Sequence, residues 1–494
     1  MGFDHEDFAL NAEQRQRLGY QLIDRINAYF SSLTHLPVQP PLQHRDANPH
    51  AATLPDFGQD AALVLDDLCT QMIEQGFHTP SANYFGLMNP APTYMAVLAE
   101  ALVAALNPQL ATMARSQLAS RIEAETLAWI AQRIGWRQRE QFGGSFTSGG
   151  NEANFSALAL ALTHRFPNVI EEGVIGLQAR PIFYASAEAH HSIEKSIGLL
   201  GMGRKSLRRI AANARAEMDT NALAAQIAAD KAAGLLPLCV IATAGTTSSG
   251  AIDSLPVLAN LCAQHGLWLH VDAAYGGALA FSDQHRHRLA GIERADSITI
   301  DPHKWLAMPF AAGVVLTRHP ALLEQVFGID TAYLPKSSHG PLPDNFRISA
   351  QWSRRMNSLK FWLTLRVHGR LAYEQLIGEQ LALAESLEQQ VLAGGNFVMA
   401  VPRALTILNL RAKVATELHL DEATTAHLHR EIVRRITDEG VHWLSTTRVH
   451  GRSVLRLMVI SYLTQQQHVD ALARKLDTAA RLSVEAMGLL KAQP

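Results

Sequence analysis

A lysine lies just past the end of a predicted strand in the second half of the chain. The β-rich run Ser297–Ile300 leads into the polar corner Asp301-Pro302-His303-Lys304, and apolar residues on both sides indicate partial burial. Removing a lysine from water lowers its pKa, so its uncharged amine can attack a carbonyl carbon and form an imine. Most lysines instead keep their charged end in water, so this stretch alone favours an ordinary surface lysine.

A glycine-rich loop, Ser148-Gly149-Gly150-Asn151, separates a predicted short strand at Ser145–Thr147 from a helix predicted from Glu152 onward. Glycine lets backbone N–H groups approach an anion closely, and a helix N-terminus adds partial positive charge. The loop has neither the lysine of a P-loop nor the GxGxxG spacing, so a nucleotide is not the first ligand to consider. By itself the pattern is equally typical of a glycine turn before a helix.

A carboxylate and two histidines also follow predicted strands. Asp272 ends the hydrophobic run Leu267–Val271, where a carboxylate is costly unless a cation faces it. His190 and His191 follow the run Ile182–Ala185 and could place a flat ring against a bound aromatic group. Taken singly, Asp272 could cap a strand end, and His190 could be a hydrogen-bonded core histidine.

Together these features meet the needs of an aldehyde cofactor that carries a phosphate and a pyridine ring. Lys304 would form the imine and the glycine-rich loop would hold the phosphate. Asp272 would keep the ring nitrogen protonated, which makes the ring an electron sink. Four such features in this order, each after a strand, favour a cofactor site over coincidence.

The elements that must position these residues alternate between strands and helices from residue 182 onward. Such alternation predicts an α/β fold with a mainly parallel sheet covered on both faces, whose strand ends share one edge. Helices are expected at 219–233 and 255–265. Strands are expected at Ile182–Ala185, Ser206–Ile210, Leu238–Thr243, Trp268–Asp272, Ser297–Ile300 and Gly313–Thr317.

The sequence divides into three parts. Residues 1–85 hold amphipathic helices at 11–33 and 60–75 but too little for a core, which predicts an arm that packs on a second subunit. Residues 86–375 form the large domain, where the apolar run 95–106 is expected to be buried. Residues 376–494 form a small α+β domain with strands at 405–410 and 454–460 and helices at 421–438 and 464–487. The aperiodic segment 329–347 is typical of a mobile lid.

Composition excludes several other classes of protein. Lys+Arg total 43 and Asp+Glu total 45, which gives a net charge of −2 and no basic stripe for nucleic acid. Cys69, Cys239 and Cys262 lie too far apart for a metal site or a disulfide framework, as expected in a reducing cytoplasm. The acidic N-terminus does not resemble a signal peptide, and no apolar run reaches membrane-spanning length.

Three motifs resemble those of the pyridoxal-phosphate-dependent group II amino acid decarboxylases. They are Thr147–Asn154, His270–Tyr275 and Asp301–Trp305, within a similarity that runs from about residue 15 to about residue 480. The family includes the aromatic-L-amino-acid, histidine, tyrosine, glutamate and diaminobutyrate decarboxylases. The resemblance implies pyridoxal 5′-phosphate as cofactor, the fold-type I (aspartate aminotransferase-like) architecture, and a homodimer with active sites at the subunit interface.

The resemblance also implies roles for single residues. Lys304 matches the imine lysine, Asp272 the partner of the ring nitrogen, His190 the stacking histidine, and Tyr333 a tyrosine on the mobile loop that protonates the substrate carbon. The remaining cofactor contacts implied are Gly149, Gly150, Asn151, Thr247, Ala274 and His303.

The sequence departs from the family at the phosphate and around the substrate. Asp301 stands where asparagine is common; a carboxylate there would be repelled by a phosphate, so it is expected to turn to a backbone donor or to His303. Side-chain-pocket positions carry Leu87, Met88, Asn89 and Ser353, without the rings of the aromatic-specific enzymes.

An aromatic or related L-amino acid is the leading substrate class, and glutamate-type or diaminobutyrate-type decarboxylation is an alternative. An aldehyde-forming decarboxylase, an aminotransferase and a non-catalytic cofactor-binding protein are further alternatives. Tyr333 and His190 together favour simple decarboxylation to an amine, because aldehyde-forming relatives alter one or the other.

Overall fold

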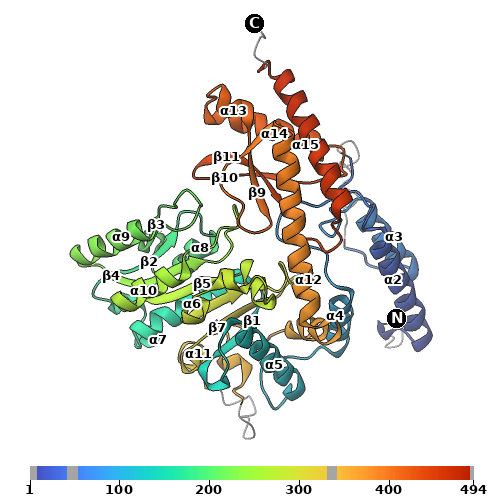
Figure 1. Ribbon diagram of the computed structural model, residues 1–494. Helices are drawn as coiled ribbons and strands as arrows, with labels where there is room; N and C mark the ends of the chain where they lie inside the picture. The colour runs from blue at the N-terminus through green and yellow to red at the C-terminus, as the bar shows by residue number, and fades with distance from the viewer. Residues whose placement is uncertain (1–7, 42–53, 331–341, 490–494) are drawn as a thin grey trace.

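A seven-stranded sheet forms the centre of the molecule and confirms the predicted α/β fold (Figure 1). The computed structural model describes residues 8–41, 54–330 and 342–489. β7 is antiparallel to both of its neighbours, whereas the other strand pairs are parallel. The strand order is β1 (Gly143–Thr147), β7 (Gly313–Thr317), β6 (Ser297–Ile300), β5 (Trp268–Asp272), β4 (Leu236–Thr243), β2 (Pro181–Ser186) and β3 (Leu207–Ile210).

The inner strands are buried on both faces, as expected for a mainly parallel sheet covered by helices. Every residue of β5, β6 and β7 is buried, and these strands begin and end where the sequence predicts. The helices of this part are α5 (Gln117–Ile134), α6 (Gly150–Arg165), α7 (Val169–Glu172), α8 (Ser192–Leu199), α9 (Thr220–Ala232), α10 (Leu255–His265) and α11 (Pro320–Phe327).

Local sequence fixes many helix ends. The Asp219 side chain accepts hydrogen bonds from two N–H groups of the first turn of α9, and Asp60 does the same for α3 (Ala61–Glu74). Gly135 and Gly266 end α5 and α10 in the left-handed region, where glycine carries no steric cost. The connections between the strands and helices therefore have defined start and stop residues.

A second, antiparallel sheet lies in the C-terminal part, with the order β10 (Ser445–Val449), β11 (Arg452–Met458), β9 (Ile407–Ala412) and β8 (Phe397–Met399). Beside it lie α13 (Lys413–Glu417), α14 (Glu422–Thr437) and α15 (Gln466–Ala486). The long helix α12 (Ser358–Ala393) runs from the large sheet to this smaller one (Figure 1). It bends at Gly369, whose φ is 74°, and passes through residue 375. The division at 375/376 therefore remains a prediction.

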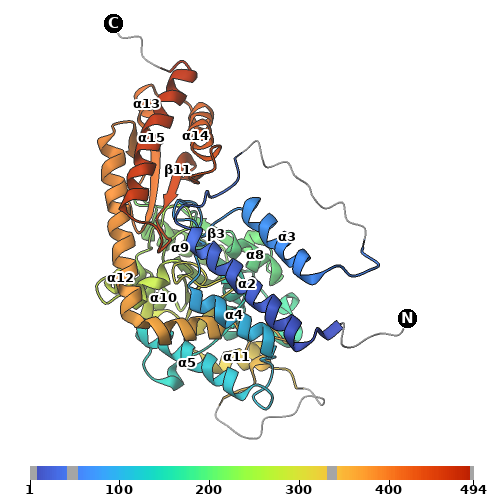
Figure 2. The same cartoon turned by 90° about the vertical axis from the view of Figure 1, so that its right-hand side faces the viewer.

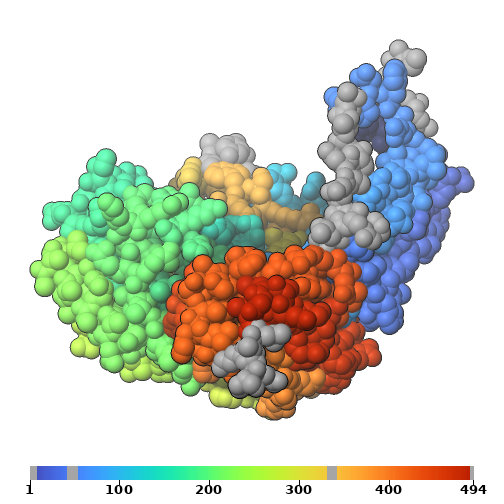
Figure 3. Space-filling model, turned by 90° about the horizontal axis from the view of Figure 1, so that it is seen from above, coloured from blue at the N-terminus to red at the C-terminus, as the bar shows by residue number. Residues whose placement is uncertain are grey.

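The N-terminal helices α2 (Ala12–Ser32) and α3 lie beside α4 (Tyr94–Leu106) at one side of the molecule (Figure 2). Seen from above, the N-terminal segments stand as a ridge beside the rest of the chain (Figure 3). Neither α2 nor α3 contains a buried residue, which agrees with an arm that has no core of its own. The end of this part does join the body, because Val38 N–H donates to the Gly440 carbonyl and Phe85 is fully buried.

The prediction that residues 95–106 are buried throughout is wrong for the single chain. α4 buries one face, Ala96, Ala99 and Val103, largely against α12. Its other face exposes Leu98, Leu102 and Leu106, the last by 69%. The apolar run therefore forms a helix that leaves one apolar face exposed, because α5 and α12 cover only its other face. Among the residues placed in the structure, no helix is both long and apolar enough to cross a membrane.

Candidate active site

A cavity of about 330 Å³ opens at the carboxyl ends of the parallel strands. All of the predicted cofactor contacts line it: Gly149, Gly150, Asn151, His190, Thr247, Asp272, Ala274, His303 and Lys304. These residues span more than 150 positions of sequence, and the shared edge of the sheet brings them together. His191 does not line the cavity, so of the two histidines the structure places His190 at the site.

The Lys304 amine pairs with a carboxylate of its own turn. Its Nζ lies 3.0 Å from Asp301 Oδ2, and the Asp301 side chain is 2% exposed. His303 Nε2 lies 3.7 Å from the same oxygen, beyond hydrogen-bonding distance. Asp301 was expected to turn to a backbone donor or to His303; it turns to Lys304 instead, because Lys304 follows by one helical-type turn and brings its charge close.

Asp272 is held by neutral donors. Its Oδ2 accepts a hydrogen bond from Asn154 Nδ2 at 2.8 Å, and its Oδ1 accepts one from the Ala274 N–H at 3.1 Å. Within the described part of the chain, no lysine or arginine forms an ion pair with this carboxylate. Asp272 is 6% exposed and lines the cavity, so its carboxyl oxygens can be reached by a group that enters the cavity.

A buried chain of hydrogen bonds fixes the direction of the Asn154 amide. Trp268 Nε1 donates to Ser297 Oγ at 2.8 Å, and that hydroxyl lies 2.9 Å from His270 Nδ1. His270 Nε2 lies 3.0 Å from Asn154 Oδ1, an acceptor, so Nε2 must carry the proton. Burial lowers the pKa of His270 to about 4, which keeps the ring neutral. The amide nitrogen of Asn154 must then face Asp272.

The anion-binding loop needs its glycines. Gly149 has φ of 146°, in the region that glycine favours, and a Cβ on Gly150 would lie 2.6 Å from Asp301 Oδ2. The N-terminus of α6 begins at Gly150, so its first N–H groups have no partner within the helix. Ser148 is already engaged, since its N–H and its hydroxyl both donate to Glu152 Oε2. The cradle fits a phosphate at the helix N-terminus, and together with Lys304 and Asp272 it fits pyridoxal phosphate.

The two site histidines have their tautomers set by backbone donors. His190 Nδ1 accepts from the Ser192 N–H at 3.2 Å, and His303 Nδ1 accepts from the Ala312 N–H at 3.0 Å. In the neutral ring each therefore carries its proton on Nε2. Burial lowers the pKa of both histidines. Nearby carboxylates raise it, but burial has the larger effect. Both present an Nε2–H donor near neutral pH.

The predicted substrate residues fall into two groups. Met88 is 7% exposed and lines the cavity. Leu87 is 48% exposed, the Asn89 side chain accepts from the Tyr84 hydroxyl, and the Ser353 hydroxyl accepts from Gln109. Leu87, Asn89 and Ser353 do not line this chain's cavity. Tyr333 lies outside the described residues.

Sequence reasoning did not assign Asn154, His270 or Phe310 to the site. Asn154 and His270 lie inside two of the recognised motifs, and a polar side chain one helical turn beyond the glycine loop was the signal that could have found Asn154. Phe310 follows a loop without periodicity, yet its ring lies 4.5 Å from that of His303 and lines the cavity.

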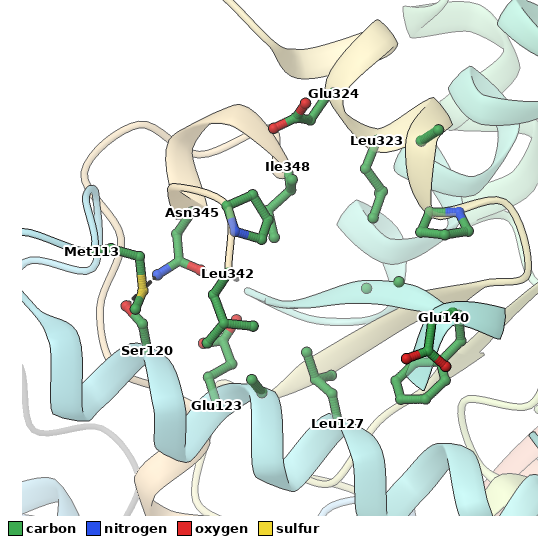
Figure 4. Close-up of a pocket in the computed structure, with 17 residues that line it drawn as sticks. Met113, Ser120, Glu123, Leu127, Glu140, Leu323, Glu324, Leu342, Asn345 and Ile348 are labelled. Carbon is green, nitrogen blue, oxygen red and sulfur yellow. Dashed lines mark hydrogen bonds between the residues drawn. The ribbon is translucent and has the colours of Figure 1, made fainter. Parts of the chain in front are cut away.

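A larger cavity, about 650 Å³, lies elsewhere (Figure 4). It is enclosed by α5, α11, β1 and the segment after residue 341, with Glu123, Glu140 and Glu324 among its walls. None of the predicted site residues lines it. Size therefore does not identify the reactive cavity; the convergence of charged groups at the strand ends does.

Comparison with known proteins identifies the family of this chain. A family model described as the pyridoxal-dependent decarboxylase conserved domain matches residues 41–413. The aromatic-L-amino-acid decarboxylase of Bacillus atrophaeus is 31% identical over 478 residues, 96% of this chain and 97% of that protein. The L-2,4-diaminobutyrate decarboxylase of Rhizobium meliloti (strain 1021) is 31% identical over 433 residues, 87% of this chain and 84% of that protein.

A crystal structure of Oryza sativa TDC with PLP and tryptamine superposes with a TM-score of 0.89 at 27% identity, covering 97% of this chain and 99% of that one. This likeness confirms the fold-type I architecture. Since the family model matches most of the chain and near full-length relatives exceed 30% identity, the chain belongs to the pyridoxal-dependent decarboxylase family and is an enzyme that uses pyridoxal 5′-phosphate to release CO2 from an L-amino acid.

Proposed function

We propose that the substrate is an aromatic or related L-amino acid and that the products are CO2 and the corresponding amine. Lys304, Asp272 and His190 line one cavity, and this placement supports the reaction type. The near full-length similarity to an aromatic-L-amino-acid decarboxylase supports the substrate class. Met88 and Phe310 add apolar walls of the kind an aromatic side chain would contact.

Bound pyridoxal phosphate supplies an aldehyde that forms an imine and a ring that accepts the electrons left when CO2 departs. In our proposal Lys304 provides the amine that holds the cofactor and is later exchanged for the substrate amine. Asp272, oriented by Asn154, keeps a proton on the ring nitrogen. His190, whose Nδ1 accepts a hydrogen bond from the Ser192 N–H, would lie against the ring.

The final protonation is assigned to Tyr333. A phenol is a weak acid, so it can give a proton to a carbanion-like carbon and recover one from solvent. Gly149, Gly150, Asn151 and His303 hold the phosphate, and Thr247 and Ala274 contact the ring. Exclusion of water favours loss of the substrate's charged carboxylate.

We further propose a homodimer with active sites at the subunit interface. The exposed leucines of α4 and the exposed apolar residues of α3, such as Leu63 at 72% and Met72 at 67%, give one side of the chain a surface typical of an interface. Leu87, Asn89 and Ser353 lie outside their own cavity, as expected for residues that serve the site of a second copy. Three free cysteines, two of them buried, agree with a cytoplasmic location, which we also propose.

A substrate panel tests the proposal. The purified enzyme with pyridoxal phosphate is given each of the twenty protein amino acids, dopa and 2,4-diaminobutyrate, and CO2 release is measured. We expect the highest kcat/KM with an aromatic amino acid. Preference for glutamate or diaminobutyrate would move the assignment to that branch of the family, and aldehyde in place of amine would identify an oxidative decarboxylase.

A further inference from the structure

Lys360 is a buried cation that does not line the cavity at the strand ends. It belongs to the first turn of α12, which packs against α4 (Figure 1), and only 1% of its side chain is exposed. An ammonium group has three N–H donors. Here they meet the Glu100 carboxylate of α4, the Pro309 carbonyl at 3.1 Å and the Ala311 carbonyl at 2.9 Å.

Pairing with Glu100 does not by itself explain the burial of Lys360. Glu100 also pairs with Arg355, whose side chain is 51% exposed, so a cation that stays in contact with water already compensates its charge. Taking a second cation out of water adds a desolvation cost that this ion pair does not require. What Lys360 adds is two charge-assisted hydrogen bonds to the carbonyls on either side of Phe310.

Phe310 needs such support because little else fixes its ring. Residues 301–312, between β6 and β7, form neither helix nor strand, so no sheet hydrogen bond sets their path. Phe310 lines the cavity but is 64% exposed, and its ring centroid lies 4.5 Å from that of His303. A side chain with so little packing around it takes its position from the backbone on both sides of it.

The backbone after Phe310 has a second attachment. The Ala312 N–H donates to His303 Nδ1 at 3.0 Å, and the His303 N–H donates to the Ala312 carbonyl at 3.3 Å. The two residues that flank Phe310 are thus held by α12, and Ala312 is held by the turn that contains His303. Loss of the Lys360 ammonium would leave only the second of these attachments.

We propose that Lys360 is a positioning residue for substrate selectivity. By holding the carbonyls of Pro309 and Ala311, it keeps the Phe310 ring against the side chain of the bound amino acid, which Lys360 itself does not touch. This role rests on the function proposed above, in which Phe310 is an apolar wall of the site. Loss of the ammonium group should therefore weaken substrate binding and leave the reaction at Lys304 unchanged.

Lys360→Met tests this role, because methionine keeps much of the length, buries no charge and leaves Glu100 paired with Arg355. Steady-state kinetics are measured with L-tryptophan, L-tyrosine and L-dopa, and the substrate with the highest wild-type kcat/KM is used throughout. We expect KM to rise by about threefold to tenfold, as for the loss of one aromatic contact, while kcat stays within about twofold. The Kd for pyridoxal phosphate, read from imine absorbance, should not change.

A double-mutant cycle shows whether Lys360 acts through Phe310. Phe310→Ala alone should raise KM at least as much as Lys360→Met, and the double variant should show no further rise. Hydrogen exchange followed by mass spectrometry tests the same link without turnover, since the peptide covering residues 305–312 should exchange faster in Lys360→Met. Multiplied effects on KM, or unchanged exchange, would overturn the proposal.

Two matched variants change neighbouring contacts only. Tyr373→Phe removes a hydrogen bond of 3.0 Å from α12 to the Leu306 carbonyl in the same loop, and Arg355→Gln removes the other cation of Glu100. Both should keep the wild-type KM. If Lys360→Met does not fold, Lys360→Gln, whose donor is one bond closer to the backbone, replaces it and should change KM in the same direction.

The other outcomes are distinct from one another. A lower melting temperature with unchanged KM in Lys360→Met would show a purely structural lysine. A raised Kd for pyridoxal phosphate with unchanged KM would show action through His303, and either result would overturn the proposal. A wild type that decarboxylates none of the three aromatic amino acids would contradict the proposed substrate class, and the same cycle with its preferred amino acid would then decide the role of Lys360.

Discussion

Asn154 Nδ2 donates to Asp272 Oδ2 at 2.8 Å, linking the helix after the anion-binding loop to the carboxylate at the end of β5. The Asn154 amide is itself oriented by His270. The same helix thus begins at the glycine loop that we propose binds the phosphate and, one turn later, holds Asp272, the proposed partner of the ring nitrogen. One element sets the distance between the two ends of the cofactor site.

Asn154→Ala should remove the hydrogen bond that orients the Asp272 carboxyl group and should therefore reduce activity. A buried hydrogen bond to a charged group contributes about 1.5–3 kcal/mol, so we expect kcat/KM to fall by roughly 10- to 100-fold. Ser192→Ala, which removes the second acceptor of the Asn154 amide nitrogen, is the matched control and should have a smaller effect. Asp272→Asn should lose most activity. Wild-type kcat/KM in Asn154→Ala would show that Asp272 needs no support from α6.

Lys304→Ala should abolish activity and remove the imine absorbance while leaving a folded protein. The physical reason is that alanine has no amine to bond with the aldehyde. Borohydride reduction of the loaded wild type, followed by peptide mapping, should place the cofactor on Lys304. Lys195→Ala, at an exposed lysine, is the control and should remain labelled at Lys304. Full activity or labelling in Lys304→Ala would contradict the cofactor assignment.

Tyr333→Phe should still release CO2 but protonate the product carbon slowly. Phenylalanine keeps the ring and removes the proton that the phenol would donate. The unprotonated, carbanion-like species can react with oxygen, so that amino acid, O2 and water give aldehyde, CO2, ammonia and hydrogen peroxide in place of the amine. Product analysis by chromatography, with a peroxide assay, separates the two paths. Amine formed at the parent rate without aldehyde would assign the proton to another donor, with His190 the next candidate.

A charged residue on the exposed face of α4 should separate the proposed dimer. Leu102, 48% exposed, is replaced by Asp, which would bury an unpaired carboxylate if two chains meet there. We expect light scattering after size exclusion to show a monomer with little activity. Ile175→Asp changes a residue that is 96% exposed in another part of the chain and should leave the dimer intact. A dimeric Leu102→Asp protein would exclude α4 from the interface.

Folding stability should fall as the pH drops below about 6.5, partly because of His429. Burial is the first cause that lowers the pKa of this histidine from its usual 6.5 to about 4. In that window the unfolded chain binds a proton that the folded chain does not, so stability is full above about pH 6.5 and is lost as the pH falls toward 4. Denaturant unfolding at about pH 7.5 and about pH 5.5 should show a loss of roughly 1 kcal/mol from this residue alone.

His429→Gln should be less stable at neutral pH but should lose less stability on acidification. His427→Gln, at an exposed histidine on the same helix, is the control and should follow wild type. An unchanged pH dependence in His429→Gln would show that other buried groups, such as His442, whose pKa burial also lowers to about 4, account for the acid sensitivity.

The sequence by itself determined the fold and brought the predicted cofactor contacts to one cavity. Strands such as Trp268–Asp272 are mainly apolar runs that end at a polar residue, so burial on both faces favours a strand and marks its limits. Because the carboxyl ends of parallel strands meet at one edge, Lys304, Asp272 and the glycine loop could be placed together before their distances were known.

Only the tertiary structure decided what depends on contacts between elements. The role of Asn154 follows from a hydrogen-bond chain that crosses two strands and a helix. Helix α4 is exposed on one face because its neighbours cover only the other face. The spacing of apolar residues in the sequence does not show how much of a helix its neighbours will cover. Periodicity and motifs in the sequence determine whether a segment is a helix or a strand and which edge of the sheet a motif lies at. The hydrogen-bond partner of a buried polar atom depends on packing between segments that are distant in sequence.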